Sequence, residues 1–174
     1  MKNILFKGNF LNLINDEGWE YVDRPASLGV VSVVGIVDEC VLLVQQFRRS
    51  QQRSVISLPG GLVERARTGE RQETAIEAAR RELREETGYE PGVFEELVNG
   101  PVSPGMTTEL VTFFIARQLM KVGDQSLDDD EDIIVHLIRI SDAPRWLRDC
   151  DEHEIKIDLK VFVGLYFLNV HRSS

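Results

Sequence analysis

Three glutamates stand three and four residues apart near the middle of the chain: Glu82, Glu85 and Glu86. Positions with this spacing are neighbours on a helix surface, and like charges there cost about 0.2–0.5 kcal/mol per pair. A helix that gathers three carboxylates on one face needs a positive group between them. Oxygen ligands of this kind suit the hard cations Mg2+ and Mn2+. The spacing therefore predicts a divalent-metal site, with Mg2+ as the expected ion and Mn2+ as the alternative.

The helix that carries these glutamates is expected over residues 74–87. Apolar residues recur along it at helical spacing and predict a face that packs against a core. Gly88 stands where a left-handed residue often ends a helix. The core-facing residues are Ala75, Ile76, Ala79 and Leu83.

Strands are expected both before and after this helix, in mixed order. That arrangement indicates a mixed α/β sheet with helices packed on it. Residues 57–61, with the sequence Ser-Leu-Pro-Gly-Gly, break the pattern just upstream of the helix. The expected strands cover 4–14, 20–22, 28–37, 41–47, 93–98, 111–118 and 133–140, and the further helices cover 143–148 and 157–170.

Composition limits the partners of the chain. Its 174 residues are 43% hydrophobic, which is typical of a soluble globular protein, and their charge is unbalanced at −9. An acidic surface argues against binding a nucleic-acid polymer but allows a small phosphorylated ligand. Cys40 and Cys150 lack metal-ligand spacing and are expected to be free thiols. We see no signal peptide and no membrane span, and expect a cytoplasmic protein.

Seven residues together resemble the signature of the Nudix hydrolases, Gly-x5-Glu-x7-Arg-Glu-U-x-Glu-Glu-x-Gly-U, where U is an aliphatic or aromatic residue. From Glu73 onward every fixed position matches, with Leu83 and Tyr89 at the U positions. The resemblance implies an α-β-α sandwich with a mixed sheet. It also implies hydrolysis of a nucleoside diphosphate linked to another group. The seven residues are Gly61, Glu73, Arg81, Glu82, Glu85, Glu86 and Gly88.

The approach to the helix departs from the signature. Eleven residues separate Gly61 from Glu73, where five are expected, which indicates a six-residue insertion within residues 63–72. In the alternative interpretation, Arg67 replaces the glycine at standard spacing, but the turn at Pro59, Gly60 and Gly61 is then unexplained. The insertion leaves the metal face intact and changes the loop that leads into it.

The resemblance also implies roles for single residues. Glu82, Glu85 and Glu86 would ligate the metal, assisted by a backbone carbonyl near Gly61, and Glu85 also counts among the catalytic residues. Two further signature residues, Glu73 and Arg81, would support this site. Glu73 would stabilise the junction of loop and helix or support the metal ligands.

Arg81 is expected to have a structural role. Four-residue spacing would let it pair with Glu77 and Glu85, which would hold one metal ligand in place.

Outside the signature, the chain resembles the ADP-ribose pyrophosphatase branch of the family at residues 41–48, 58–64 and 103–109. Pro104 follows Tyr89 by fifteen residues, as in that branch, although a proline is also an ordinary turn residue. The resemblance implies that Arg48 and Pro104 bind substrate and that the substrate is ADP-ribose. The alternatives are GDP-mannose or another nucleotide sugar, or a non-catalytic module that binds a nucleotide.

The acidic run 128–132 resembles a loop that supplies the general base in that branch. Glu131 is the first candidate and Asp129 the second, and a solvated turn is the simpler interpretation of the same residues. Residues 1–28 resemble the N-terminal antiparallel β-appendage of the branch, and residues 29–174 would form the Nudix domain. Because that appendage crosses to a second subunit in the branch, a homodimer is expected.

Overall fold

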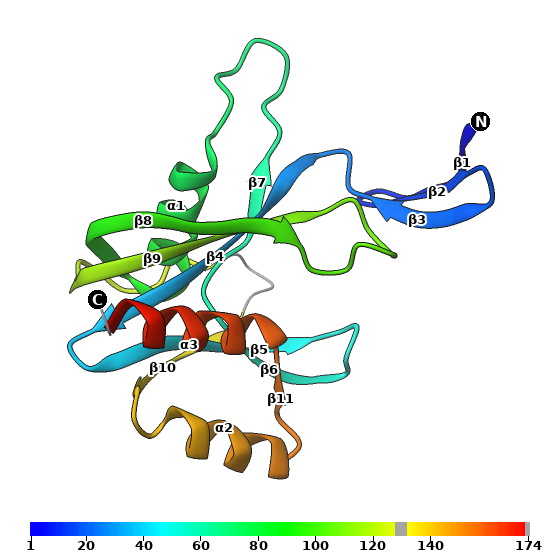
Figure 1. The fold of residues 1–174 in the computed structure, drawn as a ribbon. Helices are drawn as coiled ribbons and strands as arrows, with labels where there is room; N and C mark the ends of the chain where they lie inside the picture. Colours follow the sequence, from blue (N-terminus) through cyan, green and yellow to red (C-terminus); the bar gives the residue numbers. More distant parts are fainter. Residues whose placement is uncertain (128–131, 173–174) are drawn as a thin grey trace.

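The computed structural model describes residues 1–127 and 132–172, which form two sheets and three helices (Figure 1). A three-stranded sheet lies at the N-terminus, and an eight-stranded sheet forms the body. The elements are β1 (Lys2–Lys7), β2 (Asn12–Asp16), β3 (Trp19–Asp23), β4 (Ser27–Val37), β5 (Cys40–Arg48), β6 (Arg53–Ser57), β7 (Leu62–Glu64), α1 (Ala75–Thr87), β8 (Tyr89–Pro101), β9 (Leu110–Lys121), β10 (Ile133–Arg139), α2 (Ala143–Glu152), β11 (Lys156–Ile157) and α3 (Leu159–Arg172).

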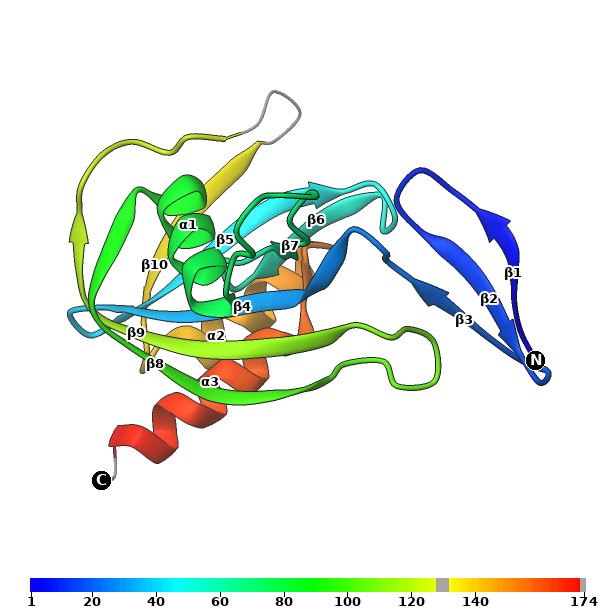
Figure 2. The same cartoon turned by 90° about the horizontal axis from the view of Figure 1, so that it is seen from above.

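The body has the predicted α-β-α architecture. Its main path runs β11-β6-β5-β4-β9-β8, with β10 paired to β5 and β7 paired to β4. The sheet is mixed, because β4–β9 and β6–β11 are parallel while the other pairs are antiparallel. Figure 2 shows α1 on one face and α2 and α3 on the other.

Strand β4 contributes side chains to two hydrophobic cores, one on each face of the sheet. Successive side chains of a strand point to opposite faces. Val31 and Val33 pack with Leu83 of α1, whereas Val34 packs with Val161 of α3. Both faces of β4 are therefore buried, which accounts for its nearly unbroken run of valines.

The N-terminal sheet differs from the prediction in one respect. The strand expected over 4–14 is two strands, β1 and β2, because a turn closes where Gly8 N donates to Leu11 O at 2.9 Å. The sheet order is β1-β2-β3, all antiparallel, so the expected appendage is present. It joins the body through Val22, whose N donates to Met106 O at 2.8 Å.

The other differences follow from short or interrupted strands. Three strands were not predicted, β6, β7 and β11, which have five, three and two residues. β8 begins at Tyr89 rather than at residue 93, despite Pro91 and Gly92. It lies at the end of the sheet path, and a proline is tolerated on such an edge strand. The α2 helix extends to Glu152, and α3 begins at Leu159.

Two further observations concern the whole chain. Cys40 and Cys150 are free thiols, as expected. None of the helices in the described ranges is long and apolar enough to cross a membrane.

Candidate active site

Helix α1 is fixed at both ends by local sequence. Thr74 is its N-cap, and a capping box joins Thr74 to Glu77 in both directions. Gly88 ends the helix in the left-handed conformation at φ 72°, as predicted, and its N–H donates to Arg84 O. These two caps fix where α1 begins and ends, and thereby fix the position of the three glutamates beside β4.

The predicted pairing of Glu77 with Arg81 is wrong. The Glu77 carboxylate instead accepts from Arg71 at 2.6 Å and from Thr74. These hydrogen bonds, chiefly the one from Arg71, lower the pKa of Glu77 to about 2. The capping box already occupies the Glu77 side chain at the helix N-terminus, so Arg81 turns to other carboxylates.

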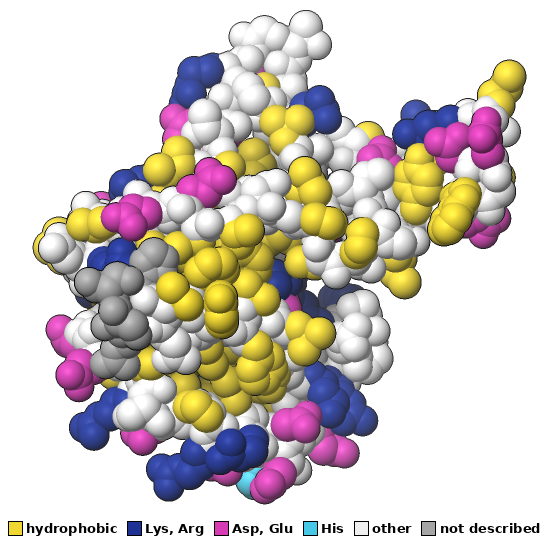
Figure 3. Space-filling model, in the orientation of Figure 1, with side chains coloured by type: hydrophobic (Ala, Val, Ile, Leu, Met, Phe, Trp, Pro, Cys, Tyr) yellow, Lys and Arg dark blue, Asp and Glu magenta, His cyan; other side chains and the backbone are white. Residues whose placement is uncertain are grey.

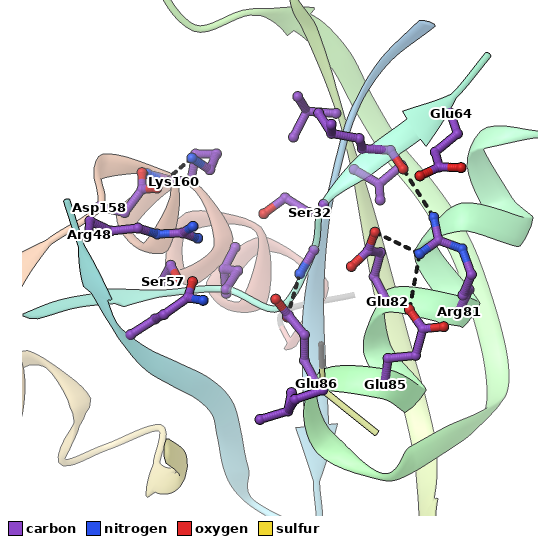
Figure 4. Close-up of a pocket in the computed structure, with 18 of the residues that line it drawn as sticks. Ser32, Arg48, Ser57, Glu64, Arg81, Glu82, Glu85, Glu86, Asp158 and Lys160 are labelled. Carbon is purple, nitrogen blue, oxygen red and sulfur yellow. Dashed lines mark hydrogen bonds and ion pairs between the residues drawn. The ribbon is translucent and has the colours of Figure 1, made fainter. Parts of the chain in front are cut away.

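The three glutamates lie on one face of α1 and line a common cavity (Figure 4). Arg81 Nη1 donates to Glu82 Oε1 at 2.8 Å and to Glu85 Oε2 at 3.0 Å. Glu86 is only 6% exposed, and its Oε2 accepts from Gly60 N at 2.9 Å. A cation and a backbone donor therefore offset the clustered negative charge in this arrangement.

Arg81 holds the helix to the loop and strand that precede it. Its Nε donates to Glu73 Oε1 at 2.9 Å, and its Nη2 donates to Leu62 O at 3.1 Å. The hydrogen bond with Glu73 is the main cause of the raised pKa of Arg81. Arg81 thus joins Glu73, β7 and two glutamates, and the supporting roles of Glu73 and Arg81 stay predictions.

Gly61, and not Arg67, lies against the glutamate face. A Cβ at Gly61 would lie 2.4 Å from the Glu82 carboxylate, so any larger residue here would displace that carboxylate. The Gly61 carbonyl accepts from Val31 N at 2.9 Å and keeps a second lone pair. Gly60 has a φ of 150°, which favours glycine. Arg67 is exposed in the inserted loop.

The insertion is a folded loop that stands above α1 in Figure 1. Arg67 N and Glu70 Oε2 close a small turn at 3.0 Å, and Gln72 donates to Glu64 O at 2.6 Å. At its base, Arg65 N donates to Ala26 O at 2.9 Å. The loop therefore extends the chain between β7 and α1 without disturbing the contact of Gly61 with Glu82.

The cavity beside the glutamates has a volume of about 740 Å³ and a second, cationic side. Arg48, predicted to bind substrate, lines it together with Arg24 and Lys160, which sequence reasoning missed. Arg24 pairs with Glu109 at 2.8 Å, and Lys160 pairs with Asp158. No local pattern marks either residue, because the β3–β4 connection, β5 and the start of α3 meet only in the folded chain.

Other predicted site residues are not in this group. Pro104 is exposed in the loop between β8 and β9 and does not line the cavity. Glu131 and Asp129 lie outside the described residues. On the near side of that segment, Leu127 lines the cavity. On the far side, Ile133 pairs with Gln46, which also lines it.

The donor set fits a hard divalent ion. Glu82, Glu85 and Glu86 offer only carboxylate oxygens, the ligands that Mg2+ and Mn2+ prefer. Within the described ranges no three acidic, histidine or cysteine side chains converge on one point, because these carboxylates turn to Arg81 and Gly60. Turning them toward the shared cavity would bring the oxygens together, and the missing Cβ of Gly61 leaves room for that movement.

Comparison with known proteins gives consistent matches. The chain is 30% identical over 156 residues to the methanol dehydrogenase activator of Bacillus methanolicus, covering 88% of this chain and 77% of that protein. It is 32% identical over 140 residues to the ADP-ribose pyrophosphatase of Bacillus subtilis (strain 168), covering 79% and 70%.

A solved structure described as an ADP compounds hydrolase shares the fold, with a TM-score of 0.73 and 18% identity over 97% of this chain and 90% of that one. The model of the NUDIX domain matches residues 26–156. This match begins at the end of the N-terminal sheet and includes the glutamate face with its glycine turn. The chain therefore belongs to the Nudix family of hydrolases and resembles the family's ADP-ribose pyrophosphatases.

Proposed function

We propose that this Nudix hydrolase uses Mg2+ to hydrolyse ADP-ribose to AMP and ribose 5-phosphate. The observation that carries the proposal is the two-sided cavity, in which the carboxylates of α1 face Arg48 and Lys160. A diphosphate needs both sides, because cations bind its oxygens directly while carboxylates bind it through a metal. The likeness to an ADP-ribose pyrophosphatase supports the choice of substrate.

In this reaction a water oxygen bonds to one phosphorus and the bridging P–O bond breaks. The bridging oxygen leaves with the other phosphate, and the water proton passes to a base. Divalent ions held by Glu82, Glu85 and Glu86 would neutralise the diphosphate and acidify a bound water. Arg48 would donate hydrogen bonds to the phosphate, and Arg81 would hold α1 to Glu73 and β7.

Glu131 remains our proposed general base, with Asp129 as the second candidate. Two observations support the assignment. Leu127, before that segment, lines the cavity, and Ile133, after it, pairs with Gln46, which also lines the cavity. Glu131→Gln should lower kcat while leaving KM for ADP-ribose unchanged, because the water would lose its proton acceptor. If Asp129→Asn has this effect instead, the base is Asp129.

We also propose a cytoplasmic homodimer formed through residues 1–28. All six residues of β1 are exposed, and the sheet presents large apolar side chains, with Phe6 66% and Trp19 75% exposed. Such a patch on a small sheet favours a protein partner. Light scattering should give twice the chain mass, and the double variant Phe6→Ser, Trp19→Ser should give a monomer.

A product assay tests the substrate. Purified protein with Mg2+ or Mn2+ should release AMP from ADP-ribose, with a higher kcat/KM than for GDP-mannose or other nucleotide sugars. A higher kcat/KM for a nucleotide sugar would move the proposal to that alternative. Loss of AMP release on adding EDTA, and its return with Mg2+, would test the metal requirement.

The likeness to a methanol dehydrogenase activator favours one second candidate, a module that regulates a partner enzyme. The complete set of three glutamates argues for catalysis. The variant Glu86→Gln distinguishes a regulatory role that needs catalysis from one that does not. If the wild-type chain stimulates a methanol dehydrogenase and Glu86→Gln does so equally, the regulatory role does not need hydrolysis. Loss of stimulation in Glu86→Gln would tie regulation to the catalytic site.

A further inference from the structure

Ser32 is the one polar residue in the valine run of β4 from Val30 to Val34. It is 1% exposed, and its Oγ has no hydrogen-bond partner among the described residues. A buried hydroxyl without a partner destabilises a fold, and most buried hydroxyls are paired. By the packing of its strand alone, an alanine or valine would serve better at this position.

The place of Ser32 indicates what its hydroxyl could bind. Val31 and Val33 pack on the α1 side of β4, so the Ser32 side chain lies on the α3 side. Ser32 lines the same cavity as Arg48 and Lys160. Figure 4 shows it between these cations and the glutamates of α1. A ligand that spans the two sides of the cavity must pass over Ser32.

We propose that the Ser32 hydroxyl donates a hydrogen bond to a phosphoryl oxygen of the bound nucleoside diphosphate. The assignment rests on the proposed function, because that function supplies the diphosphate. Only a small group can reach a residue that is 1% exposed at the floor of the cavity, which favours an oxygen of a phosphate over a base or a sugar ring. Arg48, which lines the same cavity, favours an anionic group there, whereas Lys160 is already paired with Asp158.

The proposal predicts that Ser32→Ala weakens ligand binding without lowering the melting temperature. A purely structural role of Ser32 would predict a lower melting temperature as well. Ser32→Ala removes a hydroxyl that has no partner in the free protein, so the melting temperature without ligand should stay the same or rise. The same change removes a charge-assisted hydrogen bond to the ligand. Binding of the diphosphate should therefore weaken about 10- to 100-fold.

Thr112 on β9 provides the matched control. It is also buried, at 8% exposed, but its Oγ1 accepts from Asn99 Nδ2 at 2.7 Å and it does not line the cavity. Thr112→Val keeps the side-chain shape and removes a paired hydroxyl. It should lower the melting temperature by about 2–4 °C and leave ligand binding unchanged.

The experiment measures melting temperature without ligand, KM and kcat for ADP-ribose, and calorimetric binding of inorganic pyrophosphate with Mg2+, for wild type and both variants. The expected result for Ser32→Ala is an unchanged or raised melting temperature with weaker pyrophosphate binding and a higher KM. A lower melting temperature would overturn the proposal, because the hydroxyl would then have a protein partner. Unchanged pyrophosphate binding would overturn it as well.

The two proposals can fail separately. If wild type hydrolyses ADP-ribose and Ser32→Ala does so with the same KM and the same pyrophosphate affinity, only the role of Ser32 is lost. If wild type hydrolyses none of the substrates tested, the proposed function is lost. The pyrophosphate titration then still decides whether Ser32 binds a phosphoryl group.

Discussion

The two sides of the cavity are built in different ways. The acidic side comes from one turn and a half of α1, where Glu82, Glu85 and Glu86 share a face by helical spacing alone. The cationic side comes from residues far apart in the chain, Arg24, Arg48 and Lys160. The comparison shows that an acidic face can be encoded locally, whereas the cationic side, which we propose binds the phosphate, is assembled by the tertiary fold.

The glutamates and Arg48 differ in how firmly they are held, although Arg24 and Lys160 on the cationic side are themselves ion-paired. Arg81 and Gly60 hold the glutamates through several hydrogen bonds, and Glu86 is buried. Arg48 is exposed and forms no ion pair with the residues that the structure describes. We therefore expect substitutions on the acidic side to lower kcat and those on the cationic side to raise KM.

The largest effect is expected for Glu86→Gln. The amide oxygen can still accept from Gly60 N, so the fold should survive, but one charged oxygen donor for the metal is lost. Because loss of a residue that merely supports a ligand costs about 10–100-fold, kcat should fall by more than about 100-fold. Steady-state kinetics at saturating Mg2+ measures the change.

The control for this prediction is Glu90→Gln, which affects only a surface pair with Arg84. It should leave kcat unchanged. Near-normal kcat in Glu86→Gln would show that Glu86 is not a metal ligand, and the acidic side would then lose its assigned role.

Arg81→Lys should have the next largest effect. A lysine lacks the planar fork that lets Arg81 reach Glu73, Glu82, Glu85 and Leu62 O together. Metal affinity or kcat should fall about 10–100-fold, as for other residues that orient ligands. Mg2+ titrations of activity measure it.

Arg84→Lys is the matched control on the same helix, because Arg84 is 65% exposed and pairs only at the surface with Glu90. Equal behaviour of the two lysine variants would mean that Arg81 does not organise the glutamates.

Arg48→Ala should raise KM for ADP-ribose by about 10-fold, the lower end for a hydrogen bond to a charged group, because Arg48 is exposed. Its kcat should change little. Arg49→Ala, at the next position and outside the cavity, should leave both values as in wild type. A fall in kcat without a change in KM for Arg48→Ala would contradict the expectation that substitutions on the cationic side raise KM.

The smallest effect is expected for Thr74→Ala. Loss of the N-cap costs about 1 kcal/mol, which corresponds to roughly 2–4 °C in melting temperature for a chain of this size. Thermal unfolding measures the shift. Activity below the transition should stay unchanged, since the hydrogen bonds that Thr74 forms among the described residues go to Glu77 and Ala78, outside the cavity. A large loss of activity would show that the glutamate face depends on the first turn of α1.

Sequence reasoning succeeded where the determinants are local. The end of α1 at Gly88 and the shared face of the glutamates depend on neighbouring residues and were predicted. The pairing of Glu77 with Arg81 was wrong, although its spacing was correct. Arg71, carried by the inserted loop, competes for the same carboxylate at 2.6 Å.

Sequence by itself determined the family, the α-β-α fold and the glutamate face, because helical period and glycine turns act over a few residues. Tertiary structure decided that Gly61 meets Glu82 across the insertion, and that Arg24 and Lys160 join Arg48 around one cavity. It also decided that Ser32 would be buried there without a partner among the described residues. These relations depend on strand pairing between distant segments, which no local pattern encodes.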